Sequence, residues 1–171
     1  MWVHTVIYKV AVTSNRKISD LTRLLSGCLT IQPSSELIEW TRRELRDPVV
    51  WSKLIDRAFA HHVAPLLFRR AVRSGFLETA PAELAEFLAV TDRLNLGRNA
   101  AIVEEMIEFV ETLNRLGISP IVLKGGALLL DKHLPEHDAV MLSDLDLLVQ
   151  AGEIEGAISA ATSLGYRAIS G

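Results

Sequence analysis

Residues 121–149 read IVLKGGALLLDKHLPEHDAVMLSDLDLLV, and this stretch decides the fold. Its β-branched, apolar start predicts a buried strand over residues 118–124. A glycine pair follows, and residues 125–134 have the composition of a short helix. Residues 143–150 then predict a second strand. The order of strand, glycine turn, helix and strand is typical of an α/β sheet.

Two aspartates, Asp144 and Asp146, lie one residue apart in the second predicted strand. Because side chains alternate between the faces of a strand, both carboxylates point to one face, and Leu145 and Leu147 point to the other. Aspartate is depleted in strands, and like charges about 4 Å apart repel by ~1 kcal/mol in water. A divalent ion such as Mg²⁺ removes that repulsion because it prefers carboxylate oxygens. Two solvated acids at an exposed strand end are the alternative that the pattern leaves open.

The turn before the predicted helix carries Lys124, Gly125 and Gly126. Backbone N–H groups at such a turn can bind an anion, and glycine lets a phosphate approach the backbone closely. Lys124 adds a positive charge beside them. The turn has neither the P-loop pattern nor G-x-G-x-x-G, so on its own it also fits a plain glycine turn with a surface lysine. Together with the aspartates, it predicts a phosphate-binding turn beside a metal-binding pair.

The rest of the chain is predicted to be helical before this stretch and α/β after it. Apolar residues recur at spacings of three and four over residues 35–117, which predicts several helices. A third strand is predicted over residues 166–170. Since a sheet of two or three strands is marginal alone, we expect an α+β fold in which a helical N-terminal region packs on a small, incomplete mixed β-sheet. Residues 1–34 form a leader, either weakly structured or a short strand, and residues 118–171 begin the α/β domain.

The composition bounds the environment and the partners. The chain has 49% hydrophobic and 23% charged residues, as ordinary globular proteins do. Its net charge of -3 provides no global basic field for nucleic acid and no polybasic membrane patch. The sequence has no apolar run long enough to span a membrane and no clear signal peptide. The single cysteine, Cys28, excludes an intrachain disulfide and fits a reducing compartment, so we expect a cytoplasmic protein without membrane contact.

The motifs at residues 123–125 (LKG) and 144–149 (DLDLLV) together resemble the nucleotidyltransferase superfamily, whose best-known member is DNA polymerase beta. More closely, they resemble a bacterial family of uncharacterised nucleotidyltransferase-like proteins. The resemblance covers roughly Val49 to the end of the chain and includes Asn95 and Asn99 in the helical region.

This resemblance implies transfer of a nucleotide from a nucleoside triphosphate to an acceptor, with release of pyrophosphate. It implies that Asp144 and Asp146 are catalytic ligands of Mg²⁺, which activates the nucleophile and neutralises the phosphates. It also implies that Lys124, Gly125 and Gly126 bind the triphosphate. The sequence does not identify the acceptor, which is a small molecule, a protein or a nucleic acid, and it does not give the oligomeric state.

The resemblance also implies a third carboxylate on a later strand, whereas residues 118–171 contain only the start of the nucleotidyltransferase-like domain. We therefore expect transfer to be incomplete in this chain. The alternative is a non-catalytic nucleotide-binding or protein-assembly module that keeps the fold with a degenerate site.

Overall fold

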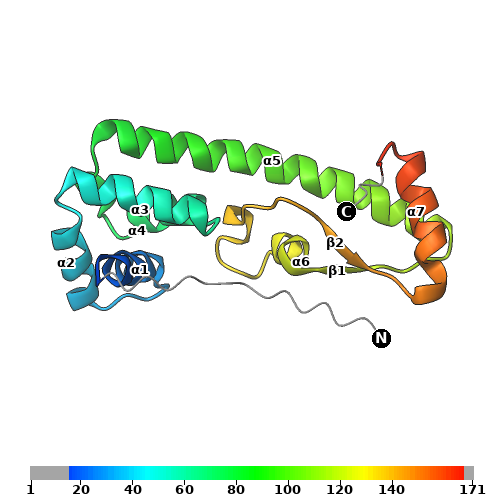
Figure 1. Cartoon of the computed structure of the whole chain (residues 1–171), viewed down its shortest axis with the longest axis horizontal. Coiled ribbons are helices and arrows are strands. Elements are labelled where there is room, and N and C mark those ends of the chain that lie inside the picture. The colour runs from blue at the N-terminus through cyan, green and yellow to red at the C-terminus, as the bar shows by residue number, and fades with distance from the viewer. Residues whose placement is uncertain (1–15, 168–171) are drawn as a thin grey trace.

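The computed structural model of the chain describes residues 16–167, and one long helix organises them. In chain order the elements are α1 (Arg16–Leu29), α2 (Ser35–Glu44), α3 (Pro48–Ala60), α4 (Ala64–Arg73), η1 (Leu77–Thr79), α5 (Ala82–Arg115), β1 (Ile121–Leu123), α6 (Lys124–Leu130), η2 (His137–Ala139), β2 (Asp146–Leu148), η3 (Ala151–Glu153) and α7 (Ile154–Ser163), where η marks a 3-10 helix. Helix α5 runs along the molecule. Helix α4 packs along one half of it, with α1 to α3 beyond, and α6, α7 and the strands lie along the other half (Figure 1). The predicted α+β fold is confirmed.

Local sequence signals set where helices α2 and α3 begin. Ser34 caps α2, because its hydroxyl accepts a hydrogen bond from the backbone N–H of Leu37. Asp47 caps α3 through the N–H of Val49, 2.9 Å away, and places an acid at the positive end of the helix dipole. Pro48 occupies the first turn of α3, where its missing N–H costs no hydrogen bond. These local signals set the starts of α2 and α3.

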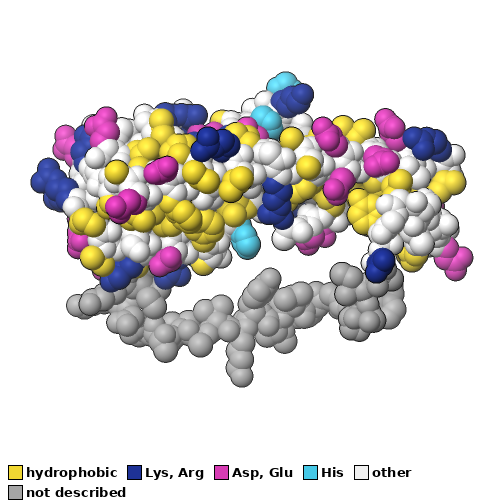
Figure 2. Space-filling view, turned by 90° about the horizontal axis from the view of Figure 1, so that it is seen from above, with side chains coloured by type: hydrophobic (Ala, Val, Ile, Leu, Met, Phe, Trp, Pro, Cys, Tyr) yellow, Lys and Arg dark blue, Asp and Glu magenta, His cyan; other side chains and the backbone are white. Residues whose placement is uncertain are grey.

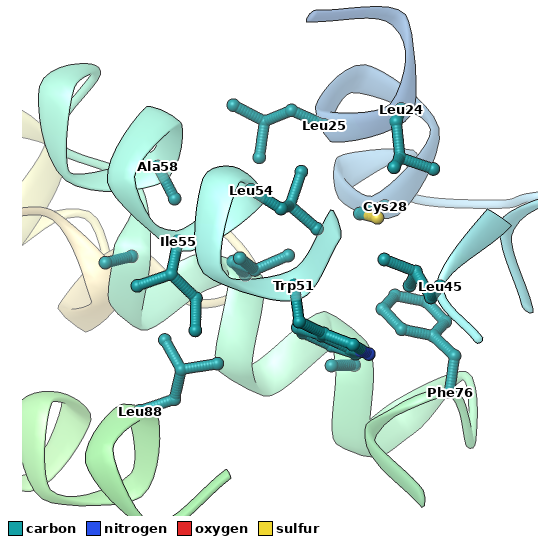
Figure 3. Close-up of a cluster of buried hydrophobic side chains, with 13 residues drawn as sticks. Leu24, Leu25, Cys28, Leu45, Trp51, Leu54, Ile55, Ala58, Phe76 and Leu88 are labelled. Atoms are coloured by element: carbon teal, nitrogen blue, oxygen red, sulfur yellow. The ribbon is translucent and has the colours of Figure 1, made fainter. Parts of the chain in front are cut away.

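Apolar side chains from α1, α3, α4 and the start of α5 form the core of the helical region (Figure 3). Trp51 is fully buried in it, with its ring centroid 6.4 Å from that of Phe76. Its indole N–H donates to the Thr79 hydroxyl at 3.2 Å, so the polar atom of the ring is satisfied. The buried members are Leu24, Leu25, Cys28, Leu45, Trp51, Leu54, Ile55, Ala58, Ala64, Leu67, Ala71, Phe76 and Leu88. Each large apolar side chain buried here contributes about 1.5–3 kcal/mol to folding.

Helix α1 differs from the weakly structured leader that the sequence predicts over residues 1–34. It is a regular helix, and Leu24 and Cys28 on it are buried in the helical core. Most of the stability of a short helix comes from packing its apolar face on other elements, and a local pattern does not reveal that packing. Residues 1–15 lie outside the described part of the chain.

A second, smaller core lies between α5, α7 and β2. Leu113, Ile118 and Ala160 are buried there, and Leu147 packs against them. Gly117 follows α5 and has a φ of +77°, the left-handed conformation that commonly ends a helix. The chain turns there and enters this core at Ile118. The turn that follows leads directly into β1.

The described sheet consists of β1 and β2, which run antiparallel. Asp146, the first residue of β2, pairs with Leu123, the last residue of β1. The chain therefore re-enters the sheet at the end where it left. The described pair is antiparallel, and the mixed sheet stays a prediction because its third strand lies mostly outside the described residues. Each strand has three residues, fewer than the predicted 118–124 and 143–150.

The remaining predictions about organisation are tested only in part. The predicted third strand lies mostly outside the described residues, and Tyr166 and Arg167 are not in a strand. Among the described helices, none is both long enough and apolar enough to cross a bilayer. The domain boundaries after residues 34 and 117 stay a prediction.

Candidate functional site

The turn between β1 and α6 has an unusual backbone at Lys124. Its φ is +49°, in the left-handed region, which costs a residue with a Cβ about 1–2 kcal/mol. Lys124 is the first residue of α6, directly after the last residue of β1. Strain of this kind persists only where surrounding contacts hold it, and it clusters at functional sites. The turn is therefore a site candidate on backbone grounds as well as on sequence.

The side chain of Lys124 reaches Asp146 at the start of the neighbouring strand. The Nζ atom lies 3.1 Å from Asp146 Oδ1, and the strand register makes the contact possible because Asp146 pairs with Leu123. The Lys124 side chain is 73% exposed and that of Asp146 33% exposed, so the pair contributes at most about 1 kcal/mol. A contact this weak lets Lys124 leave Asp146 for a stronger anion.

Asp144 lies just before β2, not within it. The alternation of faces along a strand therefore does not apply to Asp144 and Asp146, contrary to the sequence argument. Asp144 is exposed, and its Oδ1 accepts a hydrogen bond from the Ser143 hydroxyl at 2.8 Å. Asp146 contacts Lys124, and Asp144 lies two residues earlier in the chain, between Leu142 and Leu145, which pack on the glycine pair.

Gly125 and Gly126 pack closely against the segment that leads to the aspartates. A Cβ on Gly125 would lie 2.1 Å from Leu142 Cδ2, and one on Gly126 would lie 2.9 Å from Val122 Cγ1 and 3.2 Å from Leu145 Cδ2. A side chain at either position would push the turn and the aspartate segment apart. Packing is thus a reason for the glycine pair that the sequence argument missed. Phosphate binding by the pair stays a prediction.

The two aspartates suit Mg²⁺ as a partial set of ligands. Carboxylate oxygens are donors that Mg²⁺ prefers, and in nucleotide sites it is commonly held by one or two carboxylates together with substrate phosphates and water. Within residues 16–167, no group of three or more His, Cys, Asp or Glu side chains could hold a metal ion. Asp144 and Asp146 therefore fit a magnesium ion that a nucleotide brings with it better than a resident metal.

Comparison with known proteins places the chain. Residues 47–170 match the model of a family described as uncharacterised nucleotidyltransferase. The chain belongs to that family. The match includes the turn, both aspartates and helices α3 to α5, so the site candidates lie inside the shared region. Curated proteins gave no match, and neither did solved structures. Membership of the wider superfamily of DNA polymerase beta stays a prediction.

An ion-pair cluster between α4, α5 and the loop of residues 131–145 was not foreseen from the sequence. Arg69 on α4 donates to Asp92 on α5 at 2.8 Å and to Asp138 in the loop. Burial alone would raise the pKa of Asp138, but the hydrogen bond and charge of Arg69 lower it below its ordinary value. Burial likewise opposes the charge on Arg69, but the two carboxylates raise its pKa. The signal in the sequence was the polar residue Asp92 among the apolar positions of α5.

Two further arginines of α4, Arg70 and Arg73, hold the same loop through Glu136. Arg70 Nη2 lies 2.6 Å from Glu136 Oε2, and Arg73 Nη2 lies 2.9 Å from Glu136 Oε1. The side chains of Arg70 and Glu136 are each only 4% exposed. Burying a charge is costly unless it is paired, so this contact strongly constrains where the loop can lie.

An apolar cleft lies on the other side of β2 from Asp146. Its volume is about 690 Å³, and Leu145, Leu147 and Val149 line it together with α5 and α7. Asp144 lies at its rim. Phe109 and Tyr166 stack in it with ring centroids 5.8 Å apart. Since the leucines that line it also form the smaller core, the cleft is the partly covered core face of the sheet.

Proposed function

We propose that this chain binds a nucleoside triphosphate with Mg²⁺ and transfers its nucleotide to an acceptor. The observation that carries the proposal is the contact of Lys124 Nζ with Asp146 Oδ1 across β1 and β2. It brings the cation of the turn to Asp146, one of the two carboxylates that suit Mg²⁺. Family membership supports the coarse activity, and the choice of residues is ours.

Lys124 and the two aspartates have complementary tasks in this proposal. Asp144 and Asp146 bind Mg²⁺, which neutralises phosphate charge and activates the nucleophile. Lys124 leaves Asp146 and pairs with the phosphates, since a triphosphate is a stronger anion than one exposed carboxylate. The acceptor attacks the α-phosphorus, the bond to pyrophosphate breaks, and pyrophosphate leaves with the electron pair. Gly125 and Gly126 keep the turn close enough to the aspartate segment for both groups to reach one ligand.

A non-catalytic nucleotide-binding module is the second candidate. The described residues offer two carboxylates at the site, where the superfamily resemblance implies three. Two carboxylates suffice to hold a nucleotide with its Mg²⁺. Binding without transfer is therefore the result that this candidate predicts.

The acidic surface over the C-terminal half of α5 limits which kinds of acceptor can bind there. Acidic side chains gather over the C-terminal half of α5 (Figure 2), where Glu104, Glu105, Glu108 and Glu111 are exposed. An acidic face repels a phosphate backbone. We therefore expect that the acceptor is not a nucleic acid that lies along this face.

Label transfer tests the proposal. Nucleoside triphosphates labelled at the α-phosphorus are incubated with the chain, Mg²⁺ and pools of small molecules and proteins, and γ-labelled triphosphates serve as the control. Nucleotidyl transfer moves the α-label to an acceptor and leaves the γ-label in pyrophosphate. We expect Asp146→Asn to abolish transfer, and Asp56→Asn, at an exposed carboxylate of α3, to leave it unchanged. Transfer that survives Asp144→Asn and Asp146→Asn would show that the site is elsewhere, and binding without transfer would favour the module.

A further inference from the structure

The segment that leads into the aspartates is held by two side-chain amides of α5. Asn99 Nδ2 donates to the backbone carbonyls of Asp138 at 2.9 Å and Val140 at 2.8 Å. Asn95 Nδ2 donates to the same two carbonyls, at 3.3 Å and 3.0 Å. We call Asn95 and Asn99 the asparagine clamp. Asp138 lies in η2 and Val140 directly follows it, so the clamp supplies donors to backbone carbonyls at the end of this 3-10 helix.

The clamp lies where an apolar residue would be expected. The buried positions of α5 form one stripe, with members Leu88, Asp92, Asn95, Asn99, Met106 and Leu113. Asn95 is 5% exposed and Asn99 is 2% exposed, and burying an amide is unfavourable unless it forms hydrogen bonds. Among the described residues, Asn99 Oδ1 has no hydrogen-bond partner. The two carbonyls therefore account for the orientation of the amide, and the stripe is polar because it packs against backbone.

Contacts on both sides of the clamp hold the segment that runs from the clamp to the aspartates. Before it, the Arg69 ion pair holds the Asp138 side chain. After it, Met141 packs against the helical core, and Leu142 is buried in contact with the position of Gly125. Asp144 is only four residues beyond Val140, so little free chain separates the clamp from the site.

We propose that Asn95 and Asn99 are positioning residues, which set where Asp144 and Asp146 lie relative to Lys124. The inference rests on the proposed function, in which those aspartates bind a divalent ion. The inference gives α5 a role at the site, because both clamp residues lie on this helix and α5 packs with the helical region as well as with the α/β region. Ligands held by misplaced segments bind metal weakly, and loss of a group that orients a ligand typically weakens metal affinity about 10–100-fold.

The affinity of the protein for Mn²⁺, measured with ATP present, tests whether the clamp positions the aspartates. The full chain is titrated with Mn²⁺ by calorimetry as wild type, Asn99→Leu and Asn95→Leu. We expect each leucine variant to lose about 10-fold in Mn²⁺ affinity or more. Leu54→Ala is the matched control, because it removes fully buried apolar contacts from the helical core and leaves the hydrogen bonds and ion pairs of the loop in place. We expect it to lower the melting temperature at least as much and to change Mn²⁺ affinity by less than about 2-fold.

Amide hydrogen exchange of residues 141–148 provides a readout that does not depend on metal. We expect these amides to exchange faster in both clamp variants than in wild type, while those of α3 do not change. The milder Asn99→Ser replaces Asn99→Leu if circular dichroism shows that the leucine variant does not fold. Exchange at wild-type rates, or wild-type Mn²⁺ affinity in a folded variant, overturns the inference. If wild type itself binds no Mn²⁺, the proposed function fails, and the exchange rates alone decide whether the clamp positions the segment.

Discussion

The helical region and the α/β region are stabilised in different ways. The helical region buries a large cluster of apolar side chains around Trp51. The described α/β region has two strands of three residues and a smaller core, and Leu148 is 52% exposed. A two-stranded sheet is marginal by itself, and here ion pairs and amides from α4 and α5 hold the loop that leads into it. The site candidates thus lie in the part of the molecule whose position depends on its neighbours.

The largest effect is expected from Trp51→Ala, which should lower stability without changing the geometry of the site. Trp51→Ala removes a fully buried ring from the helical core, and such truncations cost about 3–5 kcal/mol. Thermal unfolding by circular dichroism should show a large drop in melting temperature. Well below that temperature, Mg²⁺-dependent ATP affinity should not change, because the hydrogen bond of Trp51 to Thr79 and its ring contact with Phe76 lie in the helical region. A loss of affinity in the still-folded variant would mean that the two regions are not distinct.

A methyl group at Gly125 should disturb the α/β region directly. The added Cβ would lie 2.1 Å from Leu142 Cδ2, and Leu142 is buried, so we expect a loss of about 1–3 kcal/mol. Gly97→Ala on α5 is the matched control, since nothing lies within 4 Å of its added Cβ. The control should gain about 0.5–1 kcal/mol from better helix propensity. Urea unfolding measures both, and equal effects at the two glycines would contradict the close packing of the turn.

Acid should loosen the loop before it affects the helical core. Arg69 lowers the pKa of Asp138 below its ordinary value of 3.8, against the opposing effect of burial, and His137 lowers it by a smaller amount. Arg69 also donates a hydrogen bond to Asp92, so it binds both carboxylates. A lowered folded-state pKa stabilises the fold above pH 3.8, and that contribution is lost as pH falls through the folded-state value. Below this pH, amides of residues 137–141 should exchange faster relative to those of α3, after correction for intrinsic rates. Asp138→Asn should remove most of this acid dependence, and an unchanged pH profile in that variant would exclude Asp138 as its source.

The smallest effect on stability is expected at Lys124. Lys124→Met removes an exposed ion pair with Asp146, which contributes less than about 1 kcal/mol. Urea unfolding should therefore show little change. ATP affinity should nevertheless fall, because the methionine keeps the length of the side chain and removes the charge. A variant that binds ATP as wild type does would remove Lys124 from the site.

Local signals in the sequence were enough to predict the order of elements in residues 118–150. The β-branched run, the glycine pair and the acidic strand each have a short-range cause. The direction of β2 and its start at Asp146 were not predictable, because they depend on where the loop returns to the sheet. Helix α1 was missed for the same reason, since its apolar face is explained by its place in the core.

Contacts between distant positions explain what the sequence missed at the site. Arg69 and Asp138 are separated by 69 positions, and a period or a motif carries no information at that range. The roles of Gly125 as a close-packed residue and of Cys28 as a buried thiol also depend on neighbours; burial raises the pKa of that thiol to about 12. Asn95 and Asn99 did leave a signal, because they are, with Asp92, the polar members of a buried stripe of α5 whose other members are apolar.

ATP binding with and without a divalent ion tests the central claim most directly. Calorimetry of the full chain is performed in Mg²⁺ and in EDTA, for wild type and for Asp144→Asn with Asp146→Asn. We predict that wild type binds ATP in Mg²⁺ and much more weakly in EDTA, and that the double variant gains nothing from Mg²⁺. Equal ATP affinity of the two proteins in Mg²⁺ would contradict the claim that these aspartates and the Lys124 turn form one nucleotide site.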